Sequence, residues 1–319
     1  MTNNKNTAYN RIINSALRAY PNGIKTAWWL IKITVPVSFA MMLLNHYGIL
    51  NIVGRFATPF FALLNLPGVA AIILIMSIFT NVYSVVAVLA LLNLPMREGV
   101  IIATMCLVSH NFVIENIVMK RTGSSFWEIS LVRILGSLAV AAILNFVLPG
   151  GGAVVSQELP VSTVSLSDAI YHWLMSSGGI VLKIFIIINV LLFIQELLEE
   201  FGVIPYIVRI FSPLMRMMGL PQNTTFSWVV ANIVGLAYGS AIMIDQSQKG
   251  KMNRQDADVL NHHIALSHSQ LEDPLLFLTL GYPMLPLIIP RVLIAIISVW
   301  IYRFGRRIWG DGRTCEVNN

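Results

Sequence analysis

Long apolar runs, separated by shorter polar segments, dominate the hydropathy pattern of this chain. A helix needs about 20 predominantly apolar residues to cross the hydrocarbon core of a bilayer. By that measure the pattern predicts six full membrane spans, at 27–47, 69–94, 127–148, 178–198, 223–245 and 281–303. The predicted fold class is therefore an all-α polytopic membrane protein.

Two more segments, 99–119 and 257–278, are apolar but interrupted by Ser, His, Asn and acidic residues. They contain the related stretches SHNFVIEN (109–116) and SHSQLEDP (267–274). Irregular backbone at membrane depth is tolerated only where protein buries it or where it lines a cavity. We expect each segment to form a re-entrant hairpin or a broken helix.

The chain also repeats itself. The segment GILNIVGRFATPFFALLNLP (48–67) aligns without gaps on GVIPYIVRIFSPLMRMMGLP (202–221). Further along, three pairs share one register: Ser109-His110 with Ser267-His268, Glu115 with Asp273, and Arg133 with Arg291. Random apolar sequence would not keep these polar residues in register. The pattern predicts two duplicated repeats, each with about three full spans and a broken or re-entrant hairpin.

The predicted organisation has five parts. They are a cytoplasmic basic N-terminal segment (1–23), a first repeat (24–148), a polar external linker (149–174), a second repeat (175–303) and a cytoplasmic basic tail (304–319). Cytoplasmic loops carry an excess of Lys and Arg, so both basic termini should be cytoplasmic and the repeats inverted. In this six-span arrangement the basic stretch 246–254 falls outside. A parallel arrangement would correct that but would place the uncharged segment 149–172 inside.

Composition supports the membrane class. Hydrophobic residues make up 56% of the chain and charged residues only 11%, whereas a soluble domain is about 25% charged. The net charge of +6 is not concentrated in a basic patch with stacking aromatics, so we expect no nucleic-acid binding. The N-terminal segment lacks the features of a cleaved signal peptide. Cys106 and Cys315 are far apart, and we expect no disulfide.

Ionisable groups at membrane depth usually face a pathway or a partner, and duplicated transporters bind their solutes between the repeats. The candidate solute contacts are Asn81, Tyr83, Ser109, His110, Asn111, Glu115, Asn232, Tyr238, His268, Ser269, Gln270 and Asp273. A structural interpretation stands beside this one. Arg133 would pair with Glu115 and Arg291 with Asp273, the histidines would bond to opened backbone, and the tyrosines would serve only in packing.

Amides and carboxylates together supply donors and acceptors suited to ribose hydroxyls or base edges. His110, Glu115, His268 and Asp273 would suit a relay coupled to H⁺ or Na⁺. The sequence carries no motif of a hydrolase, a zinc protease or a nucleotide-hydrolysing domain, so we expect neither an enzyme nor a cofactor. An alternative is a divalent transition-metal site formed by His263, His268, Glu272 and Asp273.

The stretches VANIVGLAYGSAIMIDQSQKGK (230–251) and LSHSQLEDPLLFLTLG (266–281) carry a family resemblance. They resemble bacterial inner-membrane proteins with the nucleoside recognition (Gate) domain, in particular the YjiH-like group. The Gate domain is similar to membrane segments of concentrative nucleoside transporters, of the ferrous iron transporter FeoB and of spore maturation proteins. The resemblance covers nearly the whole chain and implies a pore-and-gate module with broken helices.

Three hypotheses follow. The leading one is a multi-pass inner-membrane transporter for a small polar solute, with a nucleoside-like solute favoured. The second is a divalent transition-metal permease. The third is a membrane subunit that transports nothing and only stabilises a complex, either as a homo-oligomer or with a second Gate-domain protein.

Overall fold

The computed structural model describes residues 2–49, 52, 59, 61–92, 94–150, 165–233, 235–248 and 250–309, which contain helices and no strand. The N-terminal half consists of α1 (Thr2–His46), α3 (Val69–Phe79), α4 (Val82–Leu92), α5 (Met96–Ser109), α6 (Phe112–Thr122) and α7 (Phe126–Val147). The C-terminal half consists of α8 (Leu166–Glu200), α9 (Val203–Met217), η1 (Gln222–Thr224), α10 (Thr225–Ile233), α11 (Leu236–Gln248), α12 (Arg254–Ser267), α13 (Glu272–Phe277), η2 (Leu278–Leu280) and α14 (Met284–Trp309). The all-helical class predicted from the sequence is confirmed.

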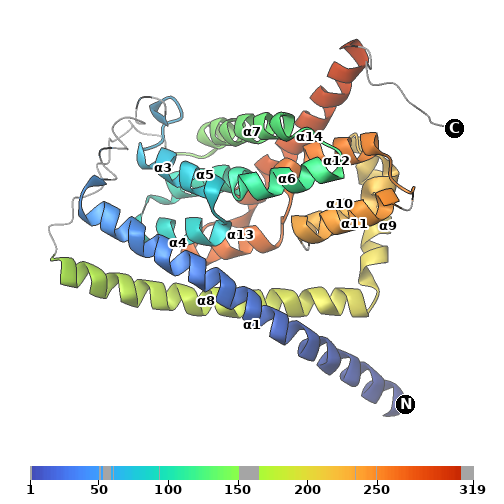
Figure 1. The fold of residues 1–319 in the computed structure, drawn as a ribbon, viewed down its shortest axis with the longest axis horizontal. Coiled ribbons are helices and arrows are strands. Elements are labelled where there is room, and N and C mark those ends of the chain that lie inside the picture. Colours follow the sequence, from blue (N-terminus) through green and yellow to red (C-terminus); the bar gives the residue numbers. More distant parts are fainter. Residues whose placement is uncertain are drawn as a thin grey trace.

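Two long helices, α1 and α8, pack side by side along one edge of the molecule (Figure 1). Ion pairs join them at one end, where Arg11 lies 2.9 Å and Arg18 2.5 Å from the carboxylate of Glu200. Hydrogen bonds from Arg11 and Arg18 lower the pKa of Glu200 below its ordinary value. The expected span 178–198 lies within α8, and the expected span 27–47 ends one residue beyond α1, although several side chains there fall outside the described structure.

Two other expected spans are single apolar helices. Phe126–Val147 of α7 and Met284–Ile308 of α14 are the two described helices that are long and apolar enough to cross a membrane. The pair α5 and α6 passes the same test as one unit with a 41° bend between its halves. Because that bend is shallow, α6 continues roughly along the course of α5, so segment 99–119 is a broken helix.

The expected full spans at 69–94 and 223–245 are wrong as continuous helices. Segment 69–94 divides at Thr80 and Asn81 into α3 and α4, and segment 223–245 divides near Gly235 into α10 and α11. Across the second break the chain folds back, because a Cβ added at Gly239 of α11 would lie 2.5 Å from the Ala231 Cβ of α10. Only glycine allows two helices to approach this closely.

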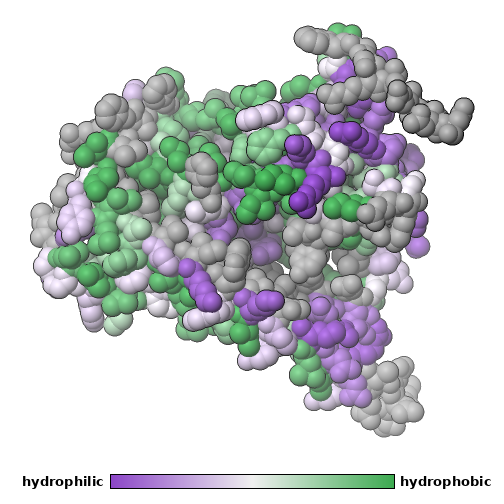
Figure 2. Space-filling model, in the orientation of Figure 1, coloured by the Kyte–Doolittle hydropathy of each residue, from purple (hydrophilic) through white to green (hydrophobic). Residues whose placement is uncertain are grey.

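The outer faces of the crossing helices are apolar, as a lipid-facing surface requires. On α7, Leu131 and Leu135 are exposed, and on α14 so are Leu293 and Ile297. Figure 2 shows hydrophobic residues over much of the left and centre of one face, with hydrophilic residues gathered at the right-hand end. The hydrophobic surface lies where the helices would contact acyl chains.

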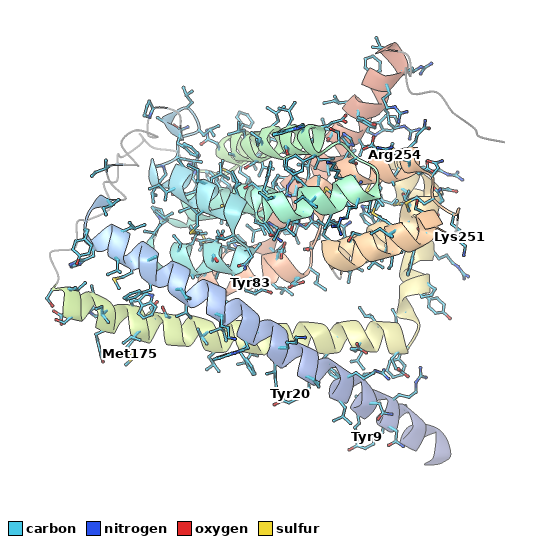
Figure 3. The ribbon with its side chains drawn as sticks, in the orientation of Figure 1. Tyr9, Tyr20, Tyr83, Met175, Lys251 and Arg254 are labelled. Carbon is cyan, nitrogen blue, oxygen red and sulfur yellow. The ribbon has the colours of Figure 1, made fainter. Side chains whose placement is uncertain are left out.

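The two ends of the molecule differ in charge. The N-terminal end of α1 and the C-terminal end of α14 lie at the same end in Figure 1. Lys251 and Arg254 lie at this end too, whereas Met175 of α8 lies at the opposite one (Figure 3). Arg254 donates a hydrogen bond to the Gly123 carbonyl, which brings the basic C-terminal turn of α6, with Lys120 and Arg121, to the same end.

Candidate functional site

Both Ser-His pairs end a helix in the same local conformation. His110 follows α5 and His268 follows α12, each with extended backbone (φ −66°, ψ 158° and φ −67°, ψ 165°). The next residues, Asn111 and Ser269, are left-handed, with φ 48° and 49°. Few non-glycine residues adopt this conformation, and such strain clusters at functional sites. The repeated motif therefore codes for a repeated break in a helix.

The breaks are joined in pairs by backbone hydrogen bonds. The Asn111 N–H reaches the carbonyls of Ser77 and Thr80, at the end of α3. The Ser269 N–H reaches the carbonyl of Ala231, and the Gln270 N–H reaches that of Asn232 (2.7 Å). Each break that follows a Ser-His pair thus supplies N–H groups to the carbonyls that the neighbouring break leaves open, which satisfies buried backbone groups.

Arg133 of α7 stabilises the helix break between α5 and α6. Its guanidinium donates to the carbonyls of Val108 (2.9 Å) and His110 (2.6 Å) and to the side-chain oxygen of Asn116 (3.0 Å). It also lies 2.8 Å from a carboxylate oxygen of Glu115, as expected from the sequence. Arg133 is fully buried, so its charge is stable there only because these groups compensate it.

Arg291 of α14 holds the second break in the same way. It donates to the carbonyls of Leu266 (3.1 Å) and His268 (2.7 Å). Unlike Arg133, it forms no ion pair within 4 Å among the described residues, and its Nη1 has no hydrogen-bond partner. The expected pairing of Arg291 with Asp273 is therefore not made.

We call Arg133 and Arg291 the arginine clamps. Four buried side chains from both halves meet between them, and we call His110, Glu115, His268 and Asp273 the central cluster. The two imidazole rings lie 5.2 Å apart, centre to centre. His110 Nε2 lies 3.4 Å from Glu115 Oε1 and 3.6 Å from Asp273 Oδ2. His268 Nε2 lies 3.3 Å from Glu115 Oε2. Two of these three contacts link one half of the chain to the other.

Backbone contacts fix the tautomer of both histidines. His110 Nδ1 lies 3.2 Å from the Leu107 carbonyl, and His268 Nδ1 lies 2.8 Å from the Ile264 carbonyl. A carbonyl only accepts hydrogen bonds, so each Nδ1 carries the hydrogen. In the neutral rings Nε2 is then an acceptor that faces carboxylate oxygens, which are also acceptors. Neither His268 Nε2 nor Asp273 Oδ2 has a hydrogen-bond partner.

Three other candidates hydrogen-bond to groups near them in the fold. Asn81 Oδ1 accepts from the Ser84 N–H and so caps α4. Ser109 Oγ bonds the Met105 carbonyl and lies 3.1 Å from Ser77 Oγ. Asn232 Nδ2 donates to the Trp228 carbonyl, whereas its buried Oδ1 has no hydrogen-bond partner in the described structure. The sequence identified these residues as polar but could not separate capping from solute contact.

Two candidates adjoin the central cluster. The Tyr83 hydroxyl donates to Glu272 Oε1 at 2.9 Å and thereby connects the two halves. Neither amide atom of Gln270 has a hydrogen-bond partner, although both are buried. Glu272 was expected to matter only for a metal, and its contact with Tyr83 was missed. The side chain of Tyr238 lies outside the described residues.

The expected metal ligands do not assemble as a set. His263 packs against Trp228, whose indole N–H donates to its Nδ1 at 3.2 Å, and Ser267 Oγ lies 2.7 Å from the same nitrogen. Among the described residues, the group able to hold an ion is instead His110, Glu115 and His268, whose ligand atoms all lie within 4.8 Å of one another.

These features define a helical membrane protein whose buried polar groups meet where its helices break. The chain belongs to the nucleoside recognition (Gate) family, whose model matches residues 27–126 and 181–300. It is 30% identical over 280 residues to the uncharacterized membrane protein YvoD of Bacillus subtilis (strain 168), covering 86% of this chain and 89% of that protein. No solved structure matches the chain. The family resemblance drawn from the sequence is confirmed.

Proposed function

We propose that this protein is a transporter that moves a small polar or charged solute through the membrane at the central cluster. One observation carries the proposal: buried, unpartnered polar atoms of both halves converge where helices from each half are broken. Polar groups at membrane depth are costly and mark solute or ion pathways. Broken helices around a central site are typical of secondary transporters rather than of enzymes.

We also propose that the two halves are inverted repeats. Arg133 bonds the carbonyls of Val108 and His110, and Arg291 bonds those of Leu266 and His268, at identical sequence separations. In each half a broken pair (α3 and α4, or α10 and α11) precedes a second broken pair and a long helix. An odd number of crossings in each half would make the repeats inverted.

The charge distribution supports an orientation with both termini in the cytoplasm of a bacterial cell. Basic residues concentrate at the end of the molecule that holds Lys251 and Arg254 (Figure 3). The positive-inside rule assigns that end to the cytoplasm. The close approach of α10 and α11 supports this orientation, because a pair of helices that turns back would keep the basic stretch 246–254 on the same side as the termini.

Cysteine labelling tests this orientation in intact cells. In a background with Cys106→Ala and Cys315→Ser, we expect Met175→Cys to react with a membrane-impermeant maleimide. Lys251→Cys should stay unlabelled until the membrane is permeabilised, because it would lie in the cytoplasm. Both positions are exposed, so each serves as the accessibility control for the other. Labelling of Lys251→Cys in sealed cells would contradict inversion.

A ligand panel tests the transport proposal. The family description supports testing nucleosides and nucleobases, and the central cluster supports testing amino acids, Na⁺ and pH as well. A solute that binds the folded protein should raise its unfolding midpoint, by about 2.7 kcal/mol of stabilisation at a hundredfold excess over Kd. The same solute should enter proteoliposomes that contain the protein.

The variant His268→Ala separates this proposal from the partner-subunit hypothesis. We expect it to remain folded and to lose solute-dependent stabilisation, because His268 Nε2 faces the cluster without a hydrogen-bond partner. A partner subunit would instead lose assembly with another membrane protein and would show no uptake of any solute in the panel or of any divalent metal. That result would contradict a transport function.

A further inference from the structure

We propose that the central cluster is a binding site for a first-row divalent transition metal, ligated by His110, Glu115 and His268, with Asp273 beside them. The inference rests on the proposed function, because it names the class of solute for the same site. It starts from an electrostatic problem. Two imidazole lone pairs and two carboxylates face one another in a buried space, with few hydrogen-bond donors among them.

The fixed tautomers create this problem. Because the Nδ1 hydrogens are held by the carbonyls of Leu107 and Ile264, both Nε2 lone pairs point at carboxylate oxygens. Acceptors facing acceptors repel unless a positive species lies between them. The Arg133 guanidinium neutralises only the Glu115 carboxylate, through its contact with Oε2. The remaining atoms, His268 Nε2 and Asp273 Oδ2, lack hydrogen-bond partners while 1% and 6% exposed.

The distances suit a bound ion. A tetrahedral zinc-like ion with bonds of about 2.0–2.1 Å keeps its ligand atoms roughly 3.3–3.4 Å apart. His110 Nε2 lies 3.4 Å from Glu115 Oε1 and His268 Nε2 lies 3.3 Å from Glu115 Oε2, so each imidazole faces a different oxygen of the same carboxylate. One ligand atom from each of the three residues lies within 4.8 Å of the other two. Asp273 Oδ2 lies 3.6 Å from His110 Nε2, at the edge of this group.

The ligand chemistry selects the metal class. Two imidazole nitrogens with carboxylates suit Zn²⁺, Fe²⁺, Mn²⁺ or Co²⁺, whereas Na⁺, Mg²⁺ and Ca²⁺ prefer sites built from oxygen alone. A histidine that binds metal through Nε2 commonly donates its Nδ1–H to a backbone carbonyl or a carboxylate. Both histidines have this arrangement before any ion binds. Arg133 and Arg291 donate hydrogen bonds to the backbone carbonyls of His110 and His268. These bonds help to fix the positions of the two rings.

Equilibrium binding of Co²⁺ and Zn²⁺ to the purified full-length protein tests the inference. We expect one equivalent of metal, removed by a chelator and restored on re-addition, and an intense visible absorption of tetrahedral Co²⁺. His110→Gln and His268→Gln should each weaken binding by at least about a hundredfold, since even outer-shell changes cost 10- to 100-fold. The matched control His263→Gln, a buried histidine bonded to Trp228, should bind normally.

The inference is overturned if no metal binds to the wild type, if binding is unchanged in both cluster variants, or if binding is lost in His263→Gln. If the variants do not fold, the Co²⁺ spectrum of the wild type decides, because its absence contradicts a tetrahedral site. Chelator-insensitive stability together with a protonated histidine in the NMR spectrum would identify a proton as the bridging species, which also overturns it.

Uptake of the same metal into proteoliposomes is measured separately. Metal binding without uptake of any solute would leave the site standing and contradict the transport function. Uptake of a panel solute without metal binding would contradict the metal site and leave the transporter standing. Uptake of Zn²⁺ that is lost in His268→Gln and kept in His263→Gln would support both.

Discussion

Arg133→Met should lower the free energy of unfolding by about 3–5 kcal/mol, the range for removing one partner of a buried ion pair. The substitution leaves the carbonyls of Val108 and His110 without their donor and leaves Glu115 as an uncompensated buried charge. Arg133→Lys should recover little, because a single ammonium cannot reach two carbonyls and a carboxylate with the geometry of a guanidinium. Thermal unfolding in detergent measures the change.

Arg303→Met provides the matched control on the other long crossing helix. Arg303 also donates to a backbone carbonyl, that of Gly219 at 2.7 Å, but it is exposed. We expect a change within about 0.5 kcal/mol, as for most surface substitutions. If Arg133→Met were no more destabilising than Arg303→Met, the clamp would not hold the break.

Asp273→Asn should reduce uptake of the solute that stabilises the wild type by roughly 10- to 150-fold, with little loss of stability. The range corresponds to about 1.5–3 kcal/mol for a hydrogen bond to a charged group. The fold should tolerate the change, because Asp273 Oδ2 has no hydrogen-bond partner and forms no ion pair with an arginine. Removing a buried charge in that situation lowers a desolvation cost.

Asp258→Asn is the opposite case and serves as the control. Its carboxylate accepts hydrogen bonds from Ser124 Oγ at 2.5 Å and from the Tyr302 hydroxyl, so we expect lower stability and normal uptake per folded molecule. Asp273→Asn should thus lower uptake and keep stability, whereas Asp258→Asn should lower stability and keep uptake. Equal uptake in wild type and Asp273→Asn would remove Asp273 from the site.

The sequence predicted the breaks at the Ser-His pairs because polar residues interrupt the apolar runs there. It missed the break at Thr80-Asn81, because one or two residues suffice to end a helix while the apolar run continues on both sides. At Gly235 and Gly239 the sequence does indicate close backbone approach or local unwinding, but the full span predicted at 223–245 is wrong. Hydropathy averaged over a span cannot register such a short interruption. The local signals were Asn81, which caps α4, and Gly235, with φ 116°.

The candidate site was predictable in part. The shared register of His110 with His268 and Glu115 with Asp273 brought together four residues that the fold does gather. Nothing in the sequence excluded His263 as a metal ligand, because its partner Trp228 lies 35 residues away and on another helix. Nor could it show that Ser109, Asn81 and Asn232 bond to nearby backbone or helix ends, since such polar residues look alike in a sequence.

The contacts within the central cluster are reciprocal between the halves. His110 of the N-terminal half faces Asp273 of the C-terminal half, and His268 faces Glu115. The arginine clamps, in contrast, each act within their own half. The crossed pairs therefore join the two halves at the helix breaks, in addition to the packing of α1 on α8 and the Tyr83–Glu272 hydrogen bond. An ion or proton bound among them would be held by both halves at once, so its binding free energy would be coupled to the way the halves pack together.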